Sequence, residues 1–297
     1  MSVERRAPEN SRELRAGRQK SRLSAPDPRR PAVFAFTLIE MLVVIVIMGI
    51  IAGLAVPALK NLGQSDAGLS ASRQLLDDVG RARQLAIANH TTVYMVFVPT
   101  NFWGNNPSAF ISSLKTSAQQ IAATNLCDKQ LTGYTFISYG GVGDQPGQHA
   151  WHYLAPWQYL PEGTFVAEQK FDLSYGNYAI VNEATGATFP ISQFNYADNI
   201  PFPTEDSPVG VDLPYVAFNY LGQLTTAQLS PQPLQQDQYI PLAHGSVLPA
   251  MDLQKNYTFN SPDVSEVPPG NSTNSSFNVV HIDWLTGRAT LEYQKVQ

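Results

Sequence analysis

Charged side chains and cysteine are scarce in this sequence. Asp, Glu, Lys and Arg make up only 14% of the 297 residues, against 43% for hydrophobic residues, and the single cysteine is Cys127. One cysteine excludes an internal disulfide framework, and the apolar share is large enough to build a core without a disulfide or a structural metal. We therefore expect Cys127 to be a small buried apolar side chain rather than a redox or nucleophilic group.

Basic residues are also scarce after residue 35. The first 35 residues hold nine of the 19 Lys and Arg side chains but only four of the 24 acids, whereas the rest of the chain holds 10 basic and 20 acidic side chains. A negative surface repels a nucleic-acid backbone, so no nucleic-acid partner is expected for this larger part. A short basic segment directly before an apolar run is typical of the cytoplasmic flank of a membrane span.

Residues 36–58 form a long apolar run in which Glu40 is the only charged residue. As a helix, these residues would extend roughly 35 Å, enough to cross a hydrocarbon core of about 30 Å. A buried core helix of this length would have a polar face, and a cleaved secretory signal would have a shorter run with a small-residue cleavage site. The sequence therefore predicts a retained membrane-spanning helix over residues 36–59, with a cytoplasmic N-terminus and everything after Lys60 outside.

The start of the run has a distinctive order, Phe36-Thr37-Leu38-Ile39-Glu40, with a proline, Pro57, 21 residues after Phe36. Over about 25 residues it resembles the N-terminal signature of type IV prepilins and type II secretion pseudopilins. The resemblance implies that a prepilin peptidase cuts between Ala35 and Phe36 on the cytoplasmic side, leaving 262 residues. It also implies that the same enzyme methylates the amino group of Phe36, and that Pro57 kinks the helix.

Glu40 needs a partner, because an ionised carboxylate inside a membrane costs on the order of a few kcal/mol. The resemblance implies that the partner is the amino group of Phe36 on a neighbouring subunit, which would neutralise both charges and set the register of stacked subunits. The family has glycine before the cut, where this chain has Ala35, and its leaders are shorter than 35 residues. Since alanine is the next smallest residue, we expect cleavage to be slower rather than absent.

Residues 60–90 continue the helical pattern, and residues 91–297 change to a strand pattern. Apolar residues at helical spacing, including Leu69, Leu76 and Val79, predict an amphipathic helix that Gly68 weakens near its start. One short helix is expected around residues 110–121, and loops over 201–214, 231–241 and 261–276. Strands are predicted at residues 91–98, 134–139, 164–167, 177–181, 215–220, 277–284 and 288–296.

The predicted fold is α+β: a long N-terminal α-helix, membrane-spanning in its first half, packed on an antiparallel β-rich head in a pilin-like arrangement. Its regions are a basic cytoplasmic leader (1–35), a transmembrane helix (36–59), an amphipathic extension (60–90) and the head (91–297). The segments YLPEGTF, YVAFNYLGQLT and VVHIDWLTGRATL resemble the minor pseudopilins of the H type and their FimT-like relatives. The heads of those proteins are shorter, so residues 101–133 and 198–214 resemble insertions.

Histidine pairs are the first candidates for other chemistry. His149 and His152 are three residues apart, a spacing that begins some metal sites, but a third ligand is lacking and the neighbouring aromatic residues predict a packed loop. His281 and Asp283 resemble a catalytic pair, yet in an alternating strand they share one face that we expect to point to solvent. We therefore predict no metal site at these histidines.

An acidic segment is the second candidate, because oxygen ligands bind calcium. It lacks the spacing of known calcium loops, so a solvated acidic loop is the expected interpretation; its acids are Asp198, Glu205, Asp206 and Asp212. The sequence also has no serine in a nucleophile elbow and no glycine-rich phosphate loop. Neither an enzyme nor a cofactor is expected.

These patterns predict a membrane-anchored, minor pilin-like or pseudopilin subunit of a type II secretion or type IV pilus-type filament, in the bacterial inner membrane with its head in the periplasm or outside. The implied partners are the prepilin peptidase and methyltransferase, other pilin-like subunits, an inner-membrane assembly platform and membrane lipid. The alternative is a binding module, an adhesin or substrate receptor, that uses the same anchor and its aromatic-rich head. An envelope enzyme is a third interpretation, which would require His149, His152 and His281 to converge.

Overall fold

The computed structural model describes residues 37–104, 106–141, 144, 149–172, 176, 178–182, 185–226, 232–273 and 278–293, without the side chains of 54–66 and 293. The chain divides into two compact units, Met1–Gly53 and Leu54–Gln297. The described elements are helices and many antiparallel strands, which confirms the predicted α+β, β-rich fold class.

One helix, α1 (Leu38–Asn89), covers the described parts of both helices that the sequence predicts, over 36–59 and 60–90. Residues 36–59 are also predicted to span a membrane, and part of this segment lies outside the described residues. Among the residues that are described, no helix is both long enough and apolar enough to cross a membrane.

The single short helix expected around residues 110–121 is two helices, α2 (Pro107–Ser113) and α3 (Ser117–Cys127). Each has its own N-terminal cap: the Asn106 side chain accepts from the backbone of Ala109, and Thr116 forms a reciprocal capping box with Gln119. Such caps satisfy backbone N–H groups that a helix start leaves without partners. The two caps therefore explain why the predicted helix is divided.

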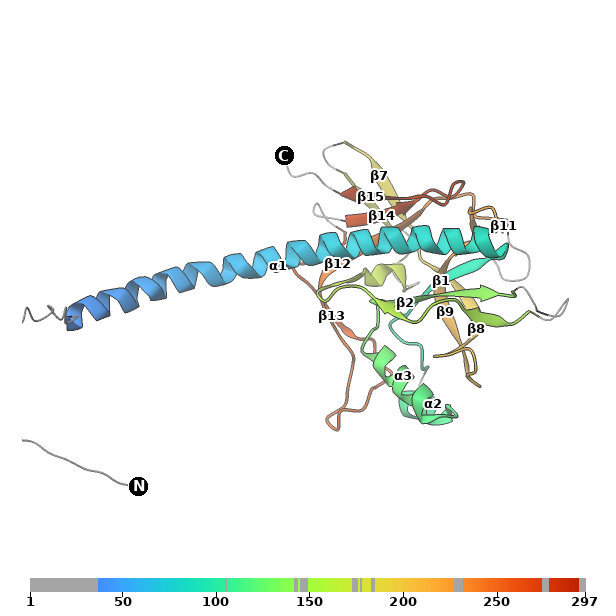
Figure 1. Cartoon of the computed structure of the whole chain (residues 1–297), viewed down its shortest axis with the longest axis horizontal. Coiled ribbons are helices and arrows are strands. Elements are labelled where there is room, and N and C mark those ends of the chain that lie inside the picture. Colours follow the sequence, from blue (N-terminus) through green and yellow to red (C-terminus); the bar gives the residue numbers. More distant parts are fainter. Residues whose placement is uncertain are drawn as a thin grey trace, which may run out of the picture. The chain divides into compact units, whose positions relative to one another are not determined.

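The larger sheet has eight antiparallel strands in the order β11-β10-β9-β1-β2-β3, with β4 also paired to β2 and β8 to β9. Figure 1 labels β1, β2, β8, β9 and β11 of this sheet. Its strands are β1 (Val93–Phe97), β2 (Gly133–Tyr139), β3 (Trp151–Tyr153), β4 (Gln158–Tyr159), β8 (Asn195–Pro201), β9 (Gly210–Phe218), β10 (Leu224–Thr226) and β11 (Gln232–Pro233). The predicted strands at 91–98 and 134–139 are confirmed as β1 and β2, which lie side by side.

A second sheet has the order β13-β12-β14-β15, with β5 also paired to β12. Its strands are β5 (Thr164–Val166), β12 (Gln238–Leu248), β13 (Asp263–Glu266), β14 (Asn278–Ile282) and β15 (Ala289–Tyr293). The predicted hairpin of the last two strands is confirmed, and Asp283 caps its turn by accepting from the N–H and hydroxyl of Thr286. A separate hairpin joins β6 (Tyr178–Val181) to β7 (Thr188–Ile191), and a short 3-10 turn, η1 (Glu168–Lys170), follows β5.

Three of the predicted loops contain strands. β9 begins at Gly210 rather than at residue 215, β12 starts inside the loop expected over 231–241, and β13 lies inside the loop expected over 261–276. Proline explains the first two errors, because it removes a backbone donor and argues against a strand. Pro214 and Pro241 nevertheless lie within β9 and β12, paired with Tyr196 and Val279.

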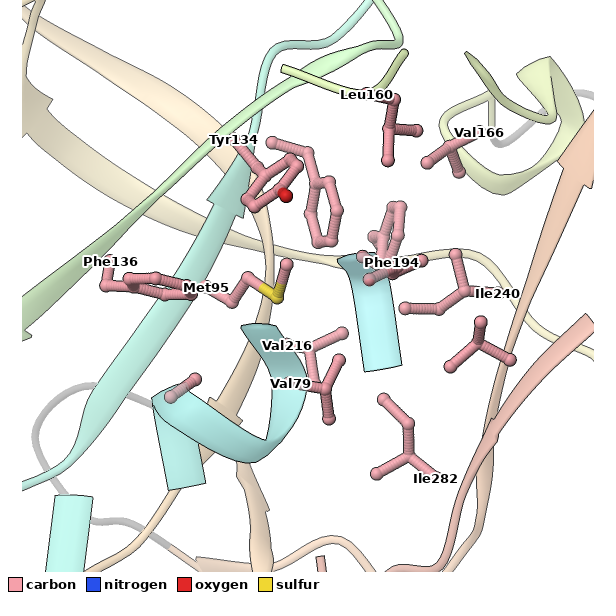
Figure 2. Packing of buried hydrophobic residues seen from close by; sticks show 14 of the residues in the cluster. Val79, Met95, Tyr134, Phe136, Leu160, Val166, Phe194, Val216, Ile240 and Ile282 are labelled. Atoms are coloured by element: carbon pink, nitrogen blue, oxygen red, sulfur yellow. The ribbon is translucent and has the colours of Figure 1, made fainter. Parts of the chain in front are cut away.

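The central strand β1 is buried on both faces. Val93, Met95 and Phe97 belong to a core shared with α1, whereas Tyr94 and Val96 belong to a second core that includes residues of α3. Figure 2 shows the first core, where Val79 of α1 points toward side chains from both sheets. A strand with two buried faces has a continuous run of apolar residues, and this run is why the sequence predicts β1 well.

The buried stripe of α1 differs from the predicted one at two positions. Leu69 is 47% exposed and Leu76 is only half-buried, so neither belongs to the fully buried face. Ala71 and Leu75 belong to this face instead, and Leu76 packs against its edge. The fully buried apolar residues of this face are Ala71, Leu75, Val79, Ala82 and Ala86.

A buried polar group joins α1 to the larger sheet. The Tyr134 hydroxyl of β2 donates to Asp78 over 2.5 Å, and the Gln74 amide donates to the same hydroxyl over 2.7 Å. Burial raises the pKa of Asp78, an effect that the hydrogen bond from Tyr134 partly opposes. The carboxylate of Asp78, the hydroxyl of Tyr134 and the amide of Gln74 are thus hydrogen-bonded to one another. These bonds fix the position of α1 against β2 without leaving these polar groups unpaired.

Gly68 lies where α1 closely approaches the second sheet. A Cβ atom at this position would overlap the Cε1 atom of His244 in β12. Gly80, in the same helix, has nothing within 4 Å of such an atom. From the sequence, Gly68 is only a weak helix former, whereas in the fold it provides space for His244.

Replacing Gly68 with alanine is expected to destabilise the head by up to about 2 kcal/mol, because an overpacking cost of about 1–3 kcal/mol exceeds the gain in helix propensity of about 1 kcal/mol. Gly80→Ala is the matched control and should be neutral or stabilising. Urea denaturation of the full chain, followed by tryptophan fluorescence, measures both variants. The explanation requires that His244→Ala reduce the cost of Gly68→Ala; equal effects of the two glycine variants would contradict it.

Candidate functional site

The described start of α1 is a capped helix terminus. The N–H of Glu40 donates to the hydroxyl of Thr37 over 3.2 Å, and the Thr37 carbonyl accepts from the N–H groups of Glu40 and Met41 over 3.1 and 3.2 Å. The order Thr37-Leu38-Ile39-Glu40 has the spacing of a capping box, and these bonds form one half of it. Thr37 therefore has a local structural role in beginning the helix.

Glu40 is an exposed carboxylate in the first turn of α1. This position is favourable for an acid, because the N-terminal end of a helix carries a partial positive charge. No cationic side chain pairs with Glu40 among the described residues. Because its side chain is exposed, the carboxylate is accessible to a positive group.

The helix surface next to Glu40 is apolar and exposed. Every described side chain from 38 to 53 is exposed, and Glu40 is the only polar one among them. An exposed apolar surface of this extent marks a contact with another protein or with lipid. Glu40 is the only charge on this surface.

Three of the predicted site residues are not tested by this geometry. Ala35 and Phe36, the proposed cleavage pair, lie outside the described residues. Pro57 lies within α1, but its side chain is among those that the structure does not describe. The processing and kink assignments remain predictions.

Comparison with known families identifies the N-terminal segment. Residues 31–56 match the family model described as the prokaryotic N-terminal methylation motif. Comparison with curated proteins and with solved structures finds no significant match to either. The chain therefore carries a prepilin-type cleavage and methylation segment, and this motif supports a type IV pilin-like or pseudopilin precursor, a structural protein rather than an enzyme. It does not distinguish the H type from other pseudopilins.

The histidines of the head do not converge. His152 lies in β3 of the larger sheet, whereas His281 lies in β14 of the second sheet. Within the described part of the chain, no group of three or more His, Cys, Asp or Glu side chains is arranged to hold a metal ion. The ring of His149 instead lies 5.6 Å from that of Tyr139.

His281 does not pair with Asp283 in the way that the sequence suggests. Its Nε2 atom is 3.0 Å from Asp237, and its ring stacks on Tyr239 with centroids 4.6 Å apart. Asp283 is used in the hairpin turn. The expectation that the two residues face solvent together is therefore wrong for His281, whose side chain is only 23% exposed.

The four acids considered for calcium do not form one loop. Asp198 and Asp212 lie in strands β8 and β9, where Asp212 accepts from the backbone N–H of Asn199. Glu205 and Asp206 lie in the turn between these strands. The sequence does not indicate the strands, because this segment is rich in turn-forming residues.

His152 connects two segments that are distant in the sequence. Its Nδ1 atom is 2.9 Å from Glu205, and its Nε2 atom is 3.1 Å from Asp144. Glu205, and then Asp144, raise the pKa of His152, and the histidine in turn lowers the pKa of Asp144. The imidazole thus holds the β8–β9 turn against β3.

Cys127 is buried, as the sequence predicts, and its thiol lies 3.3 Å from the carbonyl of Ala123. Burial raises the pKa of the thiol to about 12. A thiol that stays protonated is a poor nucleophile, so Cys127 has a packing role.

Proposed function

We propose that this chain is the precursor of a minor pilin-like or pseudopilin subunit of a type II secretion or type IV pilus-type filament. A prepilin peptidase removes residues 1–35 and methylates the new terminus at Phe36. The methylation motif at residues 31–56 is the observation that carries this proposal. The exposed apolar helix that follows Thr37 supports it, because such a surface needs lipid or other subunits to cover it.

In this proposal, residues 36–59 anchor the chain in the inner membrane as a single span. The basic residues of the leader hold the N-terminus in the cytoplasm, and the head lies in the periplasm or outside. Membrane lipid, an inner-membrane assembly platform and other pilin-like subunits are the corresponding partners. The head is of the H type, with insertions over residues 101–133 and 198–214.

Glu40 sets the register between subunits by pairing with the amino group of Phe36 on a neighbour. The accessible carboxylate and the absence of a cationic partner among the described residues support this role. Its backbone N–H is already bonded to Thr37, so pairing does not disturb the start of the helix. Without a partner, the carboxylate would remain a charge in an apolar environment, which is unfavourable.

Processing before Phe36 is expected to respond to the size of residue 35. Ala35→Gly should increase the rate of leader removal several-fold, whereas Ala35→Leu should block it, because the peptidase accepts only a small side chain there. A pulse-chase experiment that separates the precursor from the 262-residue form measures these rates in cells with and without prepilin peptidase. A leader that is never removed, or is removed equally without the peptidase, would refute the proposal.

A further inference from the structure

An open groove of about 570 Å³ lies between the segment after β3 and the turn between β8 and β9. This volume lies within the usual range for sites that bind small ligands or side chains. The proposed filament function makes no use of it. Its walls include Tyr153, Pro156, Trp157, Pro203, Glu205 and Asp206.

The two aromatic residues of the groove are fixed by hydrogen bonds at their polar atoms. The Nε1 atom of Trp157 donates to the carbonyl of Pro203 over 2.9 Å, and the hydroxyl of Tyr153 donates to the carbonyl of Pro201 over 2.7 Å. Both side chains are half-buried, so part of each ring remains accessible. With their polar atoms already bonded, these rings offer a ligand mainly their apolar, electron-rich faces.

Every charged residue that lines the groove is acidic. Glu205 and Asp206 are both exposed, and no Lys or Arg is among the described lining residues. Glu205 also accepts from the N–H of Tyr153 and contacts His152, which fixes its position beside the aromatic residues. His152 contacts Asp144 as well, so two carboxylates contact one imidazole. With Asp206 also in the lining, this end of the groove is negative even when the histidine is charged.

We propose that this groove binds an arginine or lysine side chain presented by an extended segment of another protein. The cation would lie over the aromatic faces of Trp157 and Tyr153, and Asp206 and Glu205 would neutralise its charge. Cations are attracted to aromatic faces, and a carboxylate adds charge-assisted hydrogen bonds. The lining favours this ligand over an acidic or a purely apolar segment, since the first would be repelled and the second would desolvate both carboxylates.

Hydrogen bonds already hold the rings of Tyr153 and Trp157 and the carboxylate of Glu205 in place. Binding therefore costs little side-chain conformational entropy. Asp206 is the one charged group of the groove that is exposed and not used in positioning the others. It is therefore the most informative residue to change. This interaction does not depend on the filament function, because it concerns only residues of the head.

Two peptides, each amidated at its C-terminus and carrying a neutral fluorescent label on its N-terminal nitrogen, test the proposal. One is Gly-Gly-Arg-Gly-Gly, and the other has citrulline in place of arginine, which keeps the shape and removes the charge. With a fluorescent label on each peptide, anisotropy measures binding to the full chain. We expect the arginine peptide to bind at least about fivefold more tightly than the citrulline peptide, with affinity falling as salt is added.

Variants of the chain locate the binding. Asp206→Asn and Trp157→Leu should each weaken the arginine peptide several-fold, whereas Asp263→Asn, which removes an exposed acid of β13, should not. Unchanged tryptophan fluorescence and urea denaturation for Asp206→Asn show that it folds. Equal affinity for the two peptides, or unchanged binding by Asp206→Asn, would overturn the proposal, as would a preference for a neutral oligosaccharide. A chain that is never processed at Ala35 leaves these results unaffected.

Discussion

The free energy of unfolding is expected to increase by about 2 kcal/mol between pH 7 and about pH 9 through the titration of Lys170. Replacing Lys170 with methionine should remove this increase. Lys170 is 0% exposed, and its amine lies 2.5 Å from the carbonyl of Ser192, 3.0 Å from the side-chain oxygen of Gln238 and 4.8 Å from the ring centre of Phe194. No carboxylate pairs with it among the described residues. Burial therefore lowers the pKa of Lys170 from 10.5 to about 7.

The direction of the effect follows from which state binds the proton. Above pH 7 the folded chain releases the proton of Lys170, whereas the unfolded chain holds it until about pH 10.5. The contribution of Lys170 to the free energy of unfolding therefore increases as the pH rises through this range. Below pH 7 both states hold the proton, and the full cost of the buried charge remains.

Urea denaturation of the full chain at several pH values measures this difference. Lys170→Met leaves the oxygens of Ser192 and Gln238 without their donor, which lowers the free energy of unfolding by an amount that does not depend on pH. The decisive quantity is therefore the slope of the free energy of unfolding against pH. Lys115 is exposed, and Lys115→Met is the matched control, for which the pH dependence should equal that of the parent chain. Parallel pH profiles for the parent and Lys170→Met would show that the amine is not held neutral.

Replacing Glu40 with glutamine is expected to reduce incorporation into filaments at least tenfold, while the protein remains in the membrane fraction. Glutamine keeps the size of the side chain and the helix spacing after Thr37, but it removes the charge. The amino group of Phe36 on the neighbouring subunit would then remain an unpaired charge, which costs about 3–5 kcal/mol when buried. Quantitative immunoblots of sheared filaments and membranes measure the two fractions.

Asp77→Asn is the matched control for Glu40→Gln, since Asp77 is an exposed acid on the same helix. It should leave incorporation unchanged. Normal incorporation of Glu40→Gln would show that the carboxylate has only a local role, which is to interact with the partial positive charge at the start of α1.

Local patterns predict the parts of the fold that depend on neighbouring residues. The continuous apolar run of β1 and the alternating strands β14 and β15 with their Gly287 turn lie at nearly the positions that the sequence predicts. In each of them, the buried face and the turn chemistry are visible within a few residues. The N-terminal methylation motif is also a local pattern, which is why the sequence alone identifies it.

The strand β12 cannot be predicted from local patterns. It contains Pro241 and Gly245, which both argue against a strand, yet it lies in the middle of the second sheet. Neighbours that are distant in the sequence stabilise it: β5, β13 and β14 all pair with it, and the N–H of Ala167 donates to the carbonyl of Pro241. Long-range pairing thus overrides the local preference.

The groove also cannot be predicted from local patterns, because it forms between segments that are distant in the sequence. A packed aromatic loop is predicted around residues 149–157, and Trp151 is indeed buried, whereas Trp157 lines the open groove. The opposite wall comes from residues 203–206, about 50 residues later in the chain. No spacing within either segment indicates that the two meet.

The most direct test of the proposed processing and assembly is the mass of the chain recovered from sheared filaments. We predict a 262-residue polypeptide whose first residue is N-methylated Phe36, present only in cells that contain prepilin peptidase. Intact-mass spectrometry with sequencing of the N-terminal peptide measures both features. A chain that begins at Met1 or Ser2 in that fraction, or an unmethylated terminus at another residue, would contradict the proposed function.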